Sequence, residues 1–163
     1  MDSLLSAYVV RLANLMNRRG DRIAVAESCT GGGLAQACTD QAGSSTWFDR
    51  GFVTYSNEAK QDMLGVRVET LADHGAVSEA VVREMAQGAI RHSRANVSVA
   101  ISGIAGPGGG TADKPVGTIW FAWAVRGEGV RVQRARLFGN RETVRRQAVL
   151  IALAGLIDAI RPV

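Results

Sequence analysis

The sequence predicts an α/β fold, a three-layer α/β/α sandwich with a mixed sheet. Two observations lead to this prediction. Short apolar strands alternate with amphipathic helices along most of the chain, which favours parallel strands covered by helices on both faces. Two later strands are joined as a hairpin, which adds an antiparallel pair and makes the sheet mixed. No repeat, linker or low-complexity tract interrupts the pattern, so we expect one domain over residues 1–163.

The first part of the chain alternates helix and strand signals, which rest on apolar periodicity and on capping residues. In order, we expect a helix over 3–18, a strand over 22–27, a turn over 28–33, a helix over 34–39, a strand over 48–55 and a helix that Asn57 caps.

The second part continues the alternation and then ends on the hairpin and a long helix. In order, we expect a helix over 79–93 capped by Ser78, a strand over 97–101, a glycine-rich loop over 102–114, hairpin strands over 117–125 and 130–137, and a last helix opened by Asn140.

Composition narrows the classes of protein. Lys and Arg number 19 against 15 for Asp and Glu, which mildly favours anionic partners. Only Lys60 and Lys114 are lysines, and lysine, unlike arginine, can release its proton in a protein. The chain has 19 glycines, an excess over the usual share, and this excess is clustered in residues 31–33 and 103–110.

The sequence lacks the features that several classes of function require. No apolar run approaches the roughly 18 residues of a membrane span, and the first 20 residues lack an export signal, so we expect a cytoplasmic protein. Two cysteines and two histidines have no metal-ligand spacing, which predicts no metal and no cofactor. The P-loop, the dinucleotide fingerprint, the G-x-S-x-G elbow and H-E-x-x-H are absent.

Two loops are suited to hold a small ligand, because each follows a predicted strand at its carboxyl end. Residues 27–33 combine hydroxyl groups with glycines where a strand becomes a helix, so backbone N–H groups there could approach a phosphate or a carboxylate. Residues 102–110 are the second such loop, for which an ordinary surface connection is the alternative.

A serine and lysine arrangement without histidine remains for catalysis. A seryl hydroxyl needs a base, and a lysine whose pKa is lowered by desolvation can serve. Ser45 precedes a strand and Lys60 lies in the first helical turn after it, so the chain would have to fold back for the two to meet. Tyr55 could polarise or relay the proton. The structural alternatives are that Ser45 caps a turn, that Tyr55 is core and that Lys60 lies on a solvated face.

Six blocks in order resemble the C-terminal domain of the competence and damage-inducible protein CinA, in its stand-alone form without a further N-terminal domain. They are AESCTGG at 26–32, GSS-x-WF at 43–48, GFVTYSN-x-x-K at 51–60, HGAVS at 74–78, SGIAGP at 102–107 and KPVGT at 114–118. The blocks span nearly the whole chain.

The resemblance implies an amidohydrolase that converts nicotinamide mononucleotide and water to nicotinic acid mononucleotide and ammonia. Ser45 would then be the nucleophile, Lys60 its general base and Tyr55 a hydrogen-bonding partner that tunes or relays the proton. An acyl ester on the serine would form and be hydrolysed.

The resemblance also implies the residues that bind the substrate. Those expected to do so are Ser28, Thr30, Gly31, Ser102, Gly103 and Arg141, the last as a partner for phosphate. Two positions depart from the family pattern. Asn140 stands where an aspartate is common, which removes a charge that could position the arginine, and Ser102 stands where threonine occurs.

Three alternatives stay open. Cys29 lies at a predicted helix N-terminus and could be the nucleophile instead. The chain could be a non-enzymatic binding module linked to competence or DNA damage, since arginines are frequent over residues 131–146, although sparse aromatics make nucleic acid an unlikely partner. It could also keep the fold without turnover. We expect a homodimer.

Overall fold

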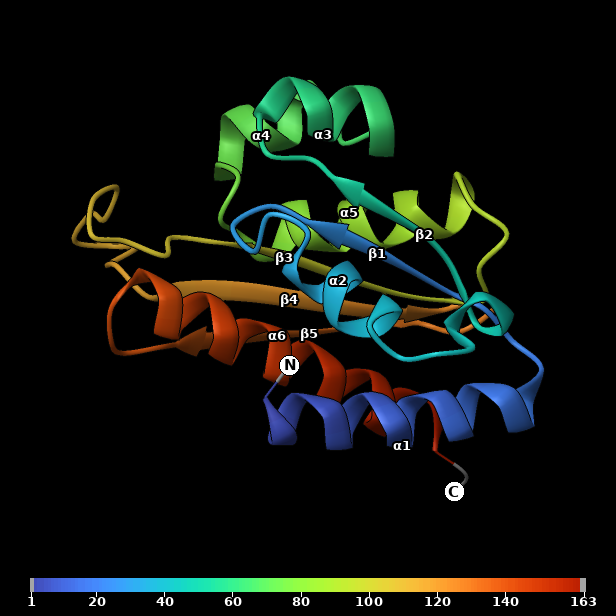
Figure 1. Cartoon of the computed structure of the whole chain (residues 1–163). Helices are drawn as coiled ribbons and strands as arrows, with labels where there is room; N and C mark the ends of the chain where they lie inside the picture. The colour runs from blue at the N-terminus through green and yellow to red at the C-terminus, as the bar shows by residue number, and fades with distance from the viewer. Residues whose placement is uncertain (1, 162–163) are drawn as a thin grey trace.

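A five-stranded sheet in the order β2-β1-β3-β4-β5 forms the centre of the molecule, in a computed structural model that describes residues 2–161 (Figure 1). The strands are β1 Ile23–Glu27, β2 Phe48–Val53, β3 Val97–Gly103, β4 Thr118–Val125 and β5 Val130–Arg136. β1 pairs in parallel with β2 and β3, whereas β4 is antiparallel to both β3 and β5. The predicted α/β fold with a mixed sheet is confirmed.

Helices cover both faces of this sheet, as Figure 1 shows. One face packs against α1 Ser3–Arg19, α2 Gly33–Thr39 and α6 Arg141–Ile160, and the other against α5 Glu79–Arg91. Two short helices, α3 Asn57–Leu64 and α4 Val68–His74, contact α5 on its outer side. Among the described residues, none of the helices has the length and apolarity that crossing a bilayer requires.

The strand side chains divide into two cores. Successive residues of a strand point to opposite faces, so Ile23 and Val25 join the core under α1 and α6, while Ala24 and Ala26 face α5. The α5 side uses mostly alanine on the central strands, including Ala100, which lets this helix approach the sheet closely.

Side-chain caps fix where most helices begin. Ser78 and Asn140 cap α5 and α6 as predicted, through their side-chain oxygens. The prediction for α3 is wrong by one residue, because the Ser56 hydroxyl accepts from the Ala59 N–H and Asn57 is already helical. Helix α4, of seven residues, was not predicted from the sequence.

The parallel register brings three strand ends to one edge of the sheet. Glu27 at the end of β1 lies opposite Val53 of β2 and Ile101 of β3. The loops that follow these strands therefore leave the sheet side by side, and the short 3-10 turn over Ser44–Thr46, which precedes β2, lies at the other end of that strand.

Candidate active site

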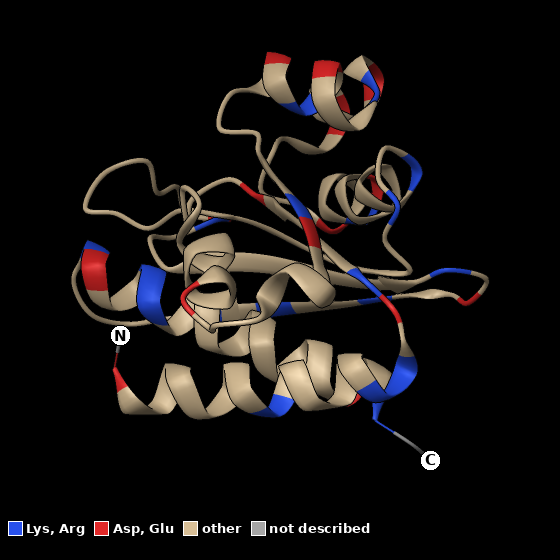
Figure 2. Cartoon of the chain, turned by 45° about the vertical axis from the view of Figure 1, so that its right-hand side comes forward, with Lys and Arg blue, Asp and Glu red and all other residues tan. Residues whose placement is uncertain are grey.

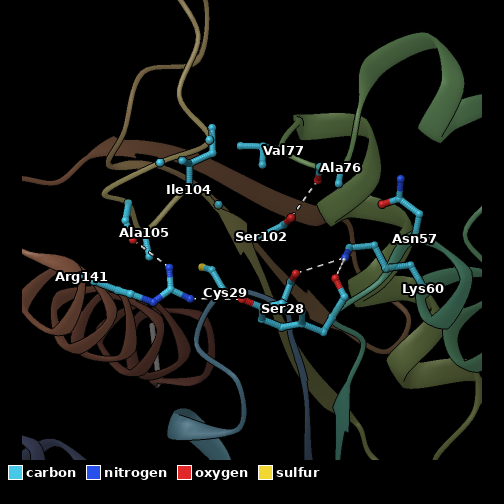
Figure 3. A pocket seen from close by; sticks show the side chains of 15 residues that line it. Ser28, Cys29, Asn57, Lys60, Ala76, Val77, Ser102, Ile104, Ala105 and Arg141 are labelled. Atoms are coloured by element: carbon cyan, nitrogen blue, oxygen red, sulfur yellow. Dashed lines mark hydrogen bonds between the residues drawn. The ribbon is translucent and has the colours of Figure 1, made fainter.

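A cavity of about 290 Å³ lies where the loops after β1, β2 and β3 meet (Figure 3). Its wall also includes the segment before α5 and the first residue of α6. Side chains and backbone from five places in the sequence thus share one hollow at the carboxyl edge of the sheet. This is the position at which open α/β sheets bind ligands.

Lys60 is buried in the wall of the cavity, with only 1% of its surface exposed. It lies one helical turn before Leu64 on the same face of α3, and Leu64 is fully buried in the core beside α5. The packing of α3 against α5 therefore turns the lysine side chain inward. Position 88 on α5 is glycine, and a Cβ there would overlap with the Leu64 carbonyl oxygen, so the close approach of the two helices requires this glycine.

The amine of Lys60 has three hydrogen-bond partners. Nζ lies 3.1 Å from Ser28 Oγ, 2.8 Å from the Thr54 carbonyl oxygen and 3.2 Å from the Tyr55 carbonyl oxygen. In the neutral amine, two N–H groups donate to the carbonyl oxygens and the lone pair is left to accept the Ser28 hydroxyl proton. The two carbonyls therefore aim the lone pair of the neutral amine at the serine.

Burial lowers the pKa of Lys60 from its ordinary value, because an ammonium in the wall of the protein has lost its hydration. The Cys29 side chain acts weakly in the opposite direction. Within residues 2–161 no carboxylate forms an ion pair with Lys60. The environment thus makes the neutral amine, the form that can take a proton, more accessible than in an exposed lysine.

Ser28 begins the tight turn that links β1 to α2 and is itself buried. Its backbone N–H donates to the Ile101 carbonyl oxygen of β3 at 3.0 Å, and its own carbonyl oxygen accepts from the Gly31 N–H at 3.0 Å. Gly31 has a φ of 58°, in the left-handed region that favours glycine, so the turn closes without strain. These bonds hold the serine backbone while Oγ faces the cavity.

Cys29 also lines the cavity, but its thiol is not activated. The pKa of Cys29 is raised to about 11, mainly by burial, and the Glu27 carboxylate contributes in the same direction. The thiol is therefore protonated at neutral pH, and a thiol is a far weaker nucleophile than a thiolate. This geometry favours Ser28 over Cys29 as the reacting group.

Arg141 stands opposite Lys60 at the first position of α6 and lines the same cavity (Figure 3). Its Nη1 donates to the Gly106 carbonyl oxygen at 2.8 Å, and its Nη2 donates to the Tyr55 hydroxyl at 3.2 Å. Both acceptors are neutral, and within the described chain no carboxylate pairs with Arg141. The guanidinium is held in place with its charge free for an anionic ligand.

Ser45 does not lie at this site, and the expected contact between Ser45 and Lys60 is absent. Ser45 is exposed in the 3-10 turn before β2, whereas Lys60 follows that strand's other end. Six strand residues at ~3.3 Å each separate the two positions by about 20 Å. The chain does not fold back around β2, because the parallel pairing with β1 keeps this strand extended. The hydroxyl that meets Lys60 belongs to Ser28.

The other expected site residues divide between the cavity and its surroundings. Tyr55, Ser102 and Gly103 line it, and the Ser102 hydroxyl donates to the Ala76 carbonyl oxygen at 2.8 Å. Thr30 and Gly31 do not line it. The Thr30 hydroxyl instead donates to the buried Glu27 carboxylate at 2.6 Å.

Several lining residues, and one residue behind the cavity wall, were not predicted from the sequence. The lining residues among them include Asn57, Ala76 and Val77. Ala76 and Val77 belong to the block HGAVS before α5. Arg145 lies one turn after Arg141 on α6 and contacts the turn that carries Ser28. Its four-residue spacing from Arg141 was the available signal, since such residues share one face of a helix.

The arginines over residues 131–146 do not form one surface. Arg131 lies over the Trp123 ring and donates to the Gly155 carbonyl oxygen. Arg136, at the other end of β5, lies over the Phe138 ring instead. Figure 2 shows basic and acidic residues distributed over many elements. Among the described residues, no group of three or more His, Cys, Asp or Glu side chains is arranged to hold a metal ion.

Comparisons with known proteins agree with this architecture. Residues 6–160 match a family model described as the CinA C-terminal domain. The protein named nicotinamide-nucleotide amidohydrolase PncC of Escherichia coli strain K12 is 57% identical over 156 residues, which cover 95% of this chain and 94% of the relative.

Two solved structures have the same fold. A competence/damage inducible protein, CihA, from Agrobacterium tumefaciens superposes with a TM-score of 0.96 at 45% identity, covering 99% of this chain and 98% of the other. A competence-damaged protein (CinA) superfamily protein from Klebsiella pneumoniae gives a TM-score of 0.92 at 47% identity, with 96% and 97% covered.

Proposed function

Because the chain belongs to the CinA C-terminal domain family, we propose that it is a nicotinamide-nucleotide amidohydrolase that works through Ser28 and Lys60. The reaction converts nicotinamide mononucleotide and water to nicotinic acid mononucleotide and ammonia. The names of close relatives support the substrate. The observation that carries the mechanism is the 3.1 Å contact between Lys60 Nζ and Ser28 Oγ in the cavity wall.

In the first half of the reaction, Ser28 is the nucleophile. Neutral Lys60 takes the hydroxyl proton as Oγ bonds to the carboxamide carbon, and the carbonyl oxygen becomes an oxyanion. The ammonium so formed keeps its donors toward the Thr54 and Tyr55 carbonyl oxygens. When the oxyanion collapses, the C–N bond breaks, Lys60 gives its proton to the leaving nitrogen, and ammonia departs.

In the second half, water replaces the serine. Lys60 is neutral again and removes a proton from a water molecule that attacks the ester carbon. The C–Oγ bond then breaks, Ser28 recovers a proton from Lys60, and the acid product gives its remaining proton to solvent and leaves as the carboxylate. One residue thus acts in turn as base and acid, which requires a pKa below that of an exposed lysine.

The phosphate of the substrate has a suitable partner across the cavity. Arg141 keeps its charge uncompensated, and the backbone N–H groups at positions 105, 106, 108 and 109 donate to no backbone carbonyl within the described chain. A guanidinium beside free N–H groups of a glycine-rich loop is a common arrangement for phosphate. We assign the phosphate to this end and the carboxamide to the Ser28 end.

Assembly and location remain part of the proposal. We propose a homodimer that works in the cytoplasm. Size-exclusion chromatography with light scattering measures the molar mass in solution. A molar mass of one chain would contradict the dimer.

The direct test is incubation with nicotinamide mononucleotide, followed by measurement of ammonia and nicotinic acid mononucleotide. We expect equal amounts of the two products from the wild type, no turnover from Ser28→Ala, and near wild-type turnover from Ser45→Ala. Loss in Ser45→Ala with retained turnover in Ser28→Ala would contradict the assignment. Absence of both products from folded wild-type protein would contradict the substrate.

A further inference from the structure

Arg145 on α6 holds the turn that carries Ser28. Its Nε donates to the Cys29 carbonyl oxygen at 3.1 Å, and its Nη2 donates to the Thr30 carbonyl oxygen at 3.3 Å. Arg145 itself does not line the catalytic cavity. The side chain therefore binds the carbonyl oxygens one and two residues after the serine, from outside the cavity.

These contacts reach the serine through a single peptide group. The Thr30 carbonyl oxygen that accepts from Arg145 belongs to the same peptide as the Gly31 N–H, and this N–H donates to the Ser28 carbonyl oxygen at 3.0 Å. A peptide group is planar, so fixing its oxygen also fixes the direction of its N–H. Linked hydrogen bonds of this kind also polarise one another. The guanidinium is thus connected to the backbone of Ser28 through one peptide group.

The other side of the turn is fixed by Glu27, so the turn is held from both sides. The buried Glu27 carboxylate accepts from the Thr30 hydroxyl at 2.6 Å and from the Leu34 and Ala35 N–H groups, each at 2.9 Å. These bonds attach the turn to the start of α2. The Thr30 carbonyl oxygen accepts from the Gly33 N–H at 2.9 Å as well as from Arg145, whereas the Cys29 carbonyl oxygen accepts from Arg145 alone among the described residues.

The partners of Arg145 differ from those of its neighbour in the sequence. Arg146 lies on the surface and forms an ion pair with the Asp2 carboxylate at 2.7 Å. Within residues 2–161, Arg145 pairs with no carboxylate, and its hydrogen-bond partners are the two carbonyl oxygens. The two arginines therefore form a matched pair, of which only one touches the nucleophile turn.

We propose that Arg145 is a positioning residue for hydrolysis, which holds the backbone of Ser28 so that Oγ stays in line with Lys60 and the bound carboxamide. This inference rests on the proposed role of Ser28. A nucleophile displaced by about 1 Å loses on the order of 10²-fold in rate, because the reacting atoms no longer meet in line. Substrate binding depends on groups across the cavity, so Arg145 affects kcat and leaves KM nearly unchanged.

The test compares Arg145→Met, Arg145→Lys and the matched control Arg146→Met with the wild type. We expect kcat for nicotinamide mononucleotide to fall on the order of 10²-fold in Arg145→Met, with KM within about threefold. Arg145→Lys keeps the positive charge and can donate to one of the two carbonyl oxygens, so its kcat falls less than that of Arg145→Met. Arg146→Met keeps wild-type kcat.

A second measurement separates positioning from folding. Arg145→Ala leaves space beside the turn, and added methylguanidinium at non-denaturing concentration is expected to raise its kcat about tenfold or more by replacing the missing donors. The labelling rate of Ser28 by a serine-directed fluorophosphonate should fall in Arg145→Met and recover in part in Arg145→Lys. A variant that merely lost stability would show neither recovery.

Each outcome decides one claim. If Arg145→Met keeps kcat within about threefold of the wild type, or changes KM alone, the positioning role is overturned. If Arg145→Met does not fold, Arg145→Lys and the methylguanidinium rescue decide, and failure of both overturns the role. Full turnover by Ser28→Ala would overturn the proposed mechanism itself, whereas an inactive Ser28→Ala together with a normal Arg145→Met overturns only the inference on Arg145.

Discussion

The Lys60 amine meets the Ser28 hydroxyl although the two residues are 32 positions apart in the chain. Ser28 follows β1 and Lys60 follows β2. Because these strands pair in parallel, the segments that follow them lie at the same edge of the sheet. The contact is thus a consequence of topology, and the chemistry of the site depends on the register of two strands.

The first prediction concerns pH. Only neutral Lys60 can accept the Ser28 proton, and burial lowers the pKa of this lysine, so the neutral form appears at lower pH than in an exposed lysine. We expect kcat/KM to rise with pH and level off with an apparent pKa below about 10.4. Lys60→Arg, which cannot release its proton, should lose on the order of 10²–10⁴-fold at every pH. A wild-type profile that falls as Lys60 loses its proton would contradict the role of a base.

The same pKa shift predicts a dependence of stability on pH. Between the lowered pKa of folded Lys60 and its ordinary value in the unfolded chain, the unfolded state binds more protons, so this residue makes stability rise with pH. Below that window the full cost of the buried ammonium is present. Urea unfolding of the wild type and Lys60→Met across pH should show a rise in the wild type that the variant lacks. Parallel curves for the two proteins would contradict the shift.

The third prediction concerns the phosphate. Removing Arg141 as Arg141→Met should raise KM for nicotinamide mononucleotide about 10- to 100-fold, the range of a charge-assisted hydrogen bond. Nicotinamide riboside lacks the phosphate, so its kcat/KM should hardly change. Steady-state assays with both substrates measure the ratio. If Arg141→Met leaves the ratio of kcat/KM for the mononucleotide to kcat/KM for the riboside unchanged, the phosphate binds elsewhere.

Tyr55 provides a separate test of the same end of the cavity. Its hydroxyl accepts from Arg141, and its backbone carbonyl oxygen accepts from Lys60. Tyr55→Phe removes only the hydroxyl, so we expect a modest rise in KM and an unchanged kcat. If kcat falls while KM stays constant, the hydroxyl relays the proton instead.

The fifth prediction concerns the packing of α3 against α5. Gly88→Ala places a methyl group against the Leu64 carbonyl oxygen and should push α3, with Lys60, away from the sheet. Overpacking of this kind costs about 1–3 kcal/mol and should lower both the unfolding free energy and kcat. Gly129→Ala is the matched control, because a Cβ there meets nothing within 4 Å. Equal stability of the two variants in urea would contradict the close packing.

The sequence predicted the architecture well because periodicity and caps act locally. The apolar spacing in α1, the cap Asn140 and the hairpin of β4 and β5 all depend on neighbouring residues, and each appears in the structure. The seven-residue helix α4 was missed because it carries little apolar periodicity and no side-chain cap.

The site was harder to predict because it depends on contacts between distant segments. Lys60 and Ser45 were paired from their residue types and their places on either side of one predicted strand, and the resemblance then implied Ser45 as the nucleophile. The order of the strands and their register decide instead that the hydroxyl of Ser28 is the one within reach. Arg145 was missed for the same reason, since its partners lie more than 110 residues away.

The most direct test of the account is to quench the wild-type enzyme during turnover of nicotinamide mononucleotide and map the acylated residue by mass spectrometry. We predict an adduct with the mass of the substrate less ammonia on Ser28, absent from Ser28→Ala, with fragmentation separating Ser28 from the adjacent Cys29. An adduct on Ser45 or on Cys29 would contradict the central claim that the serine beside Lys60 is the nucleophile.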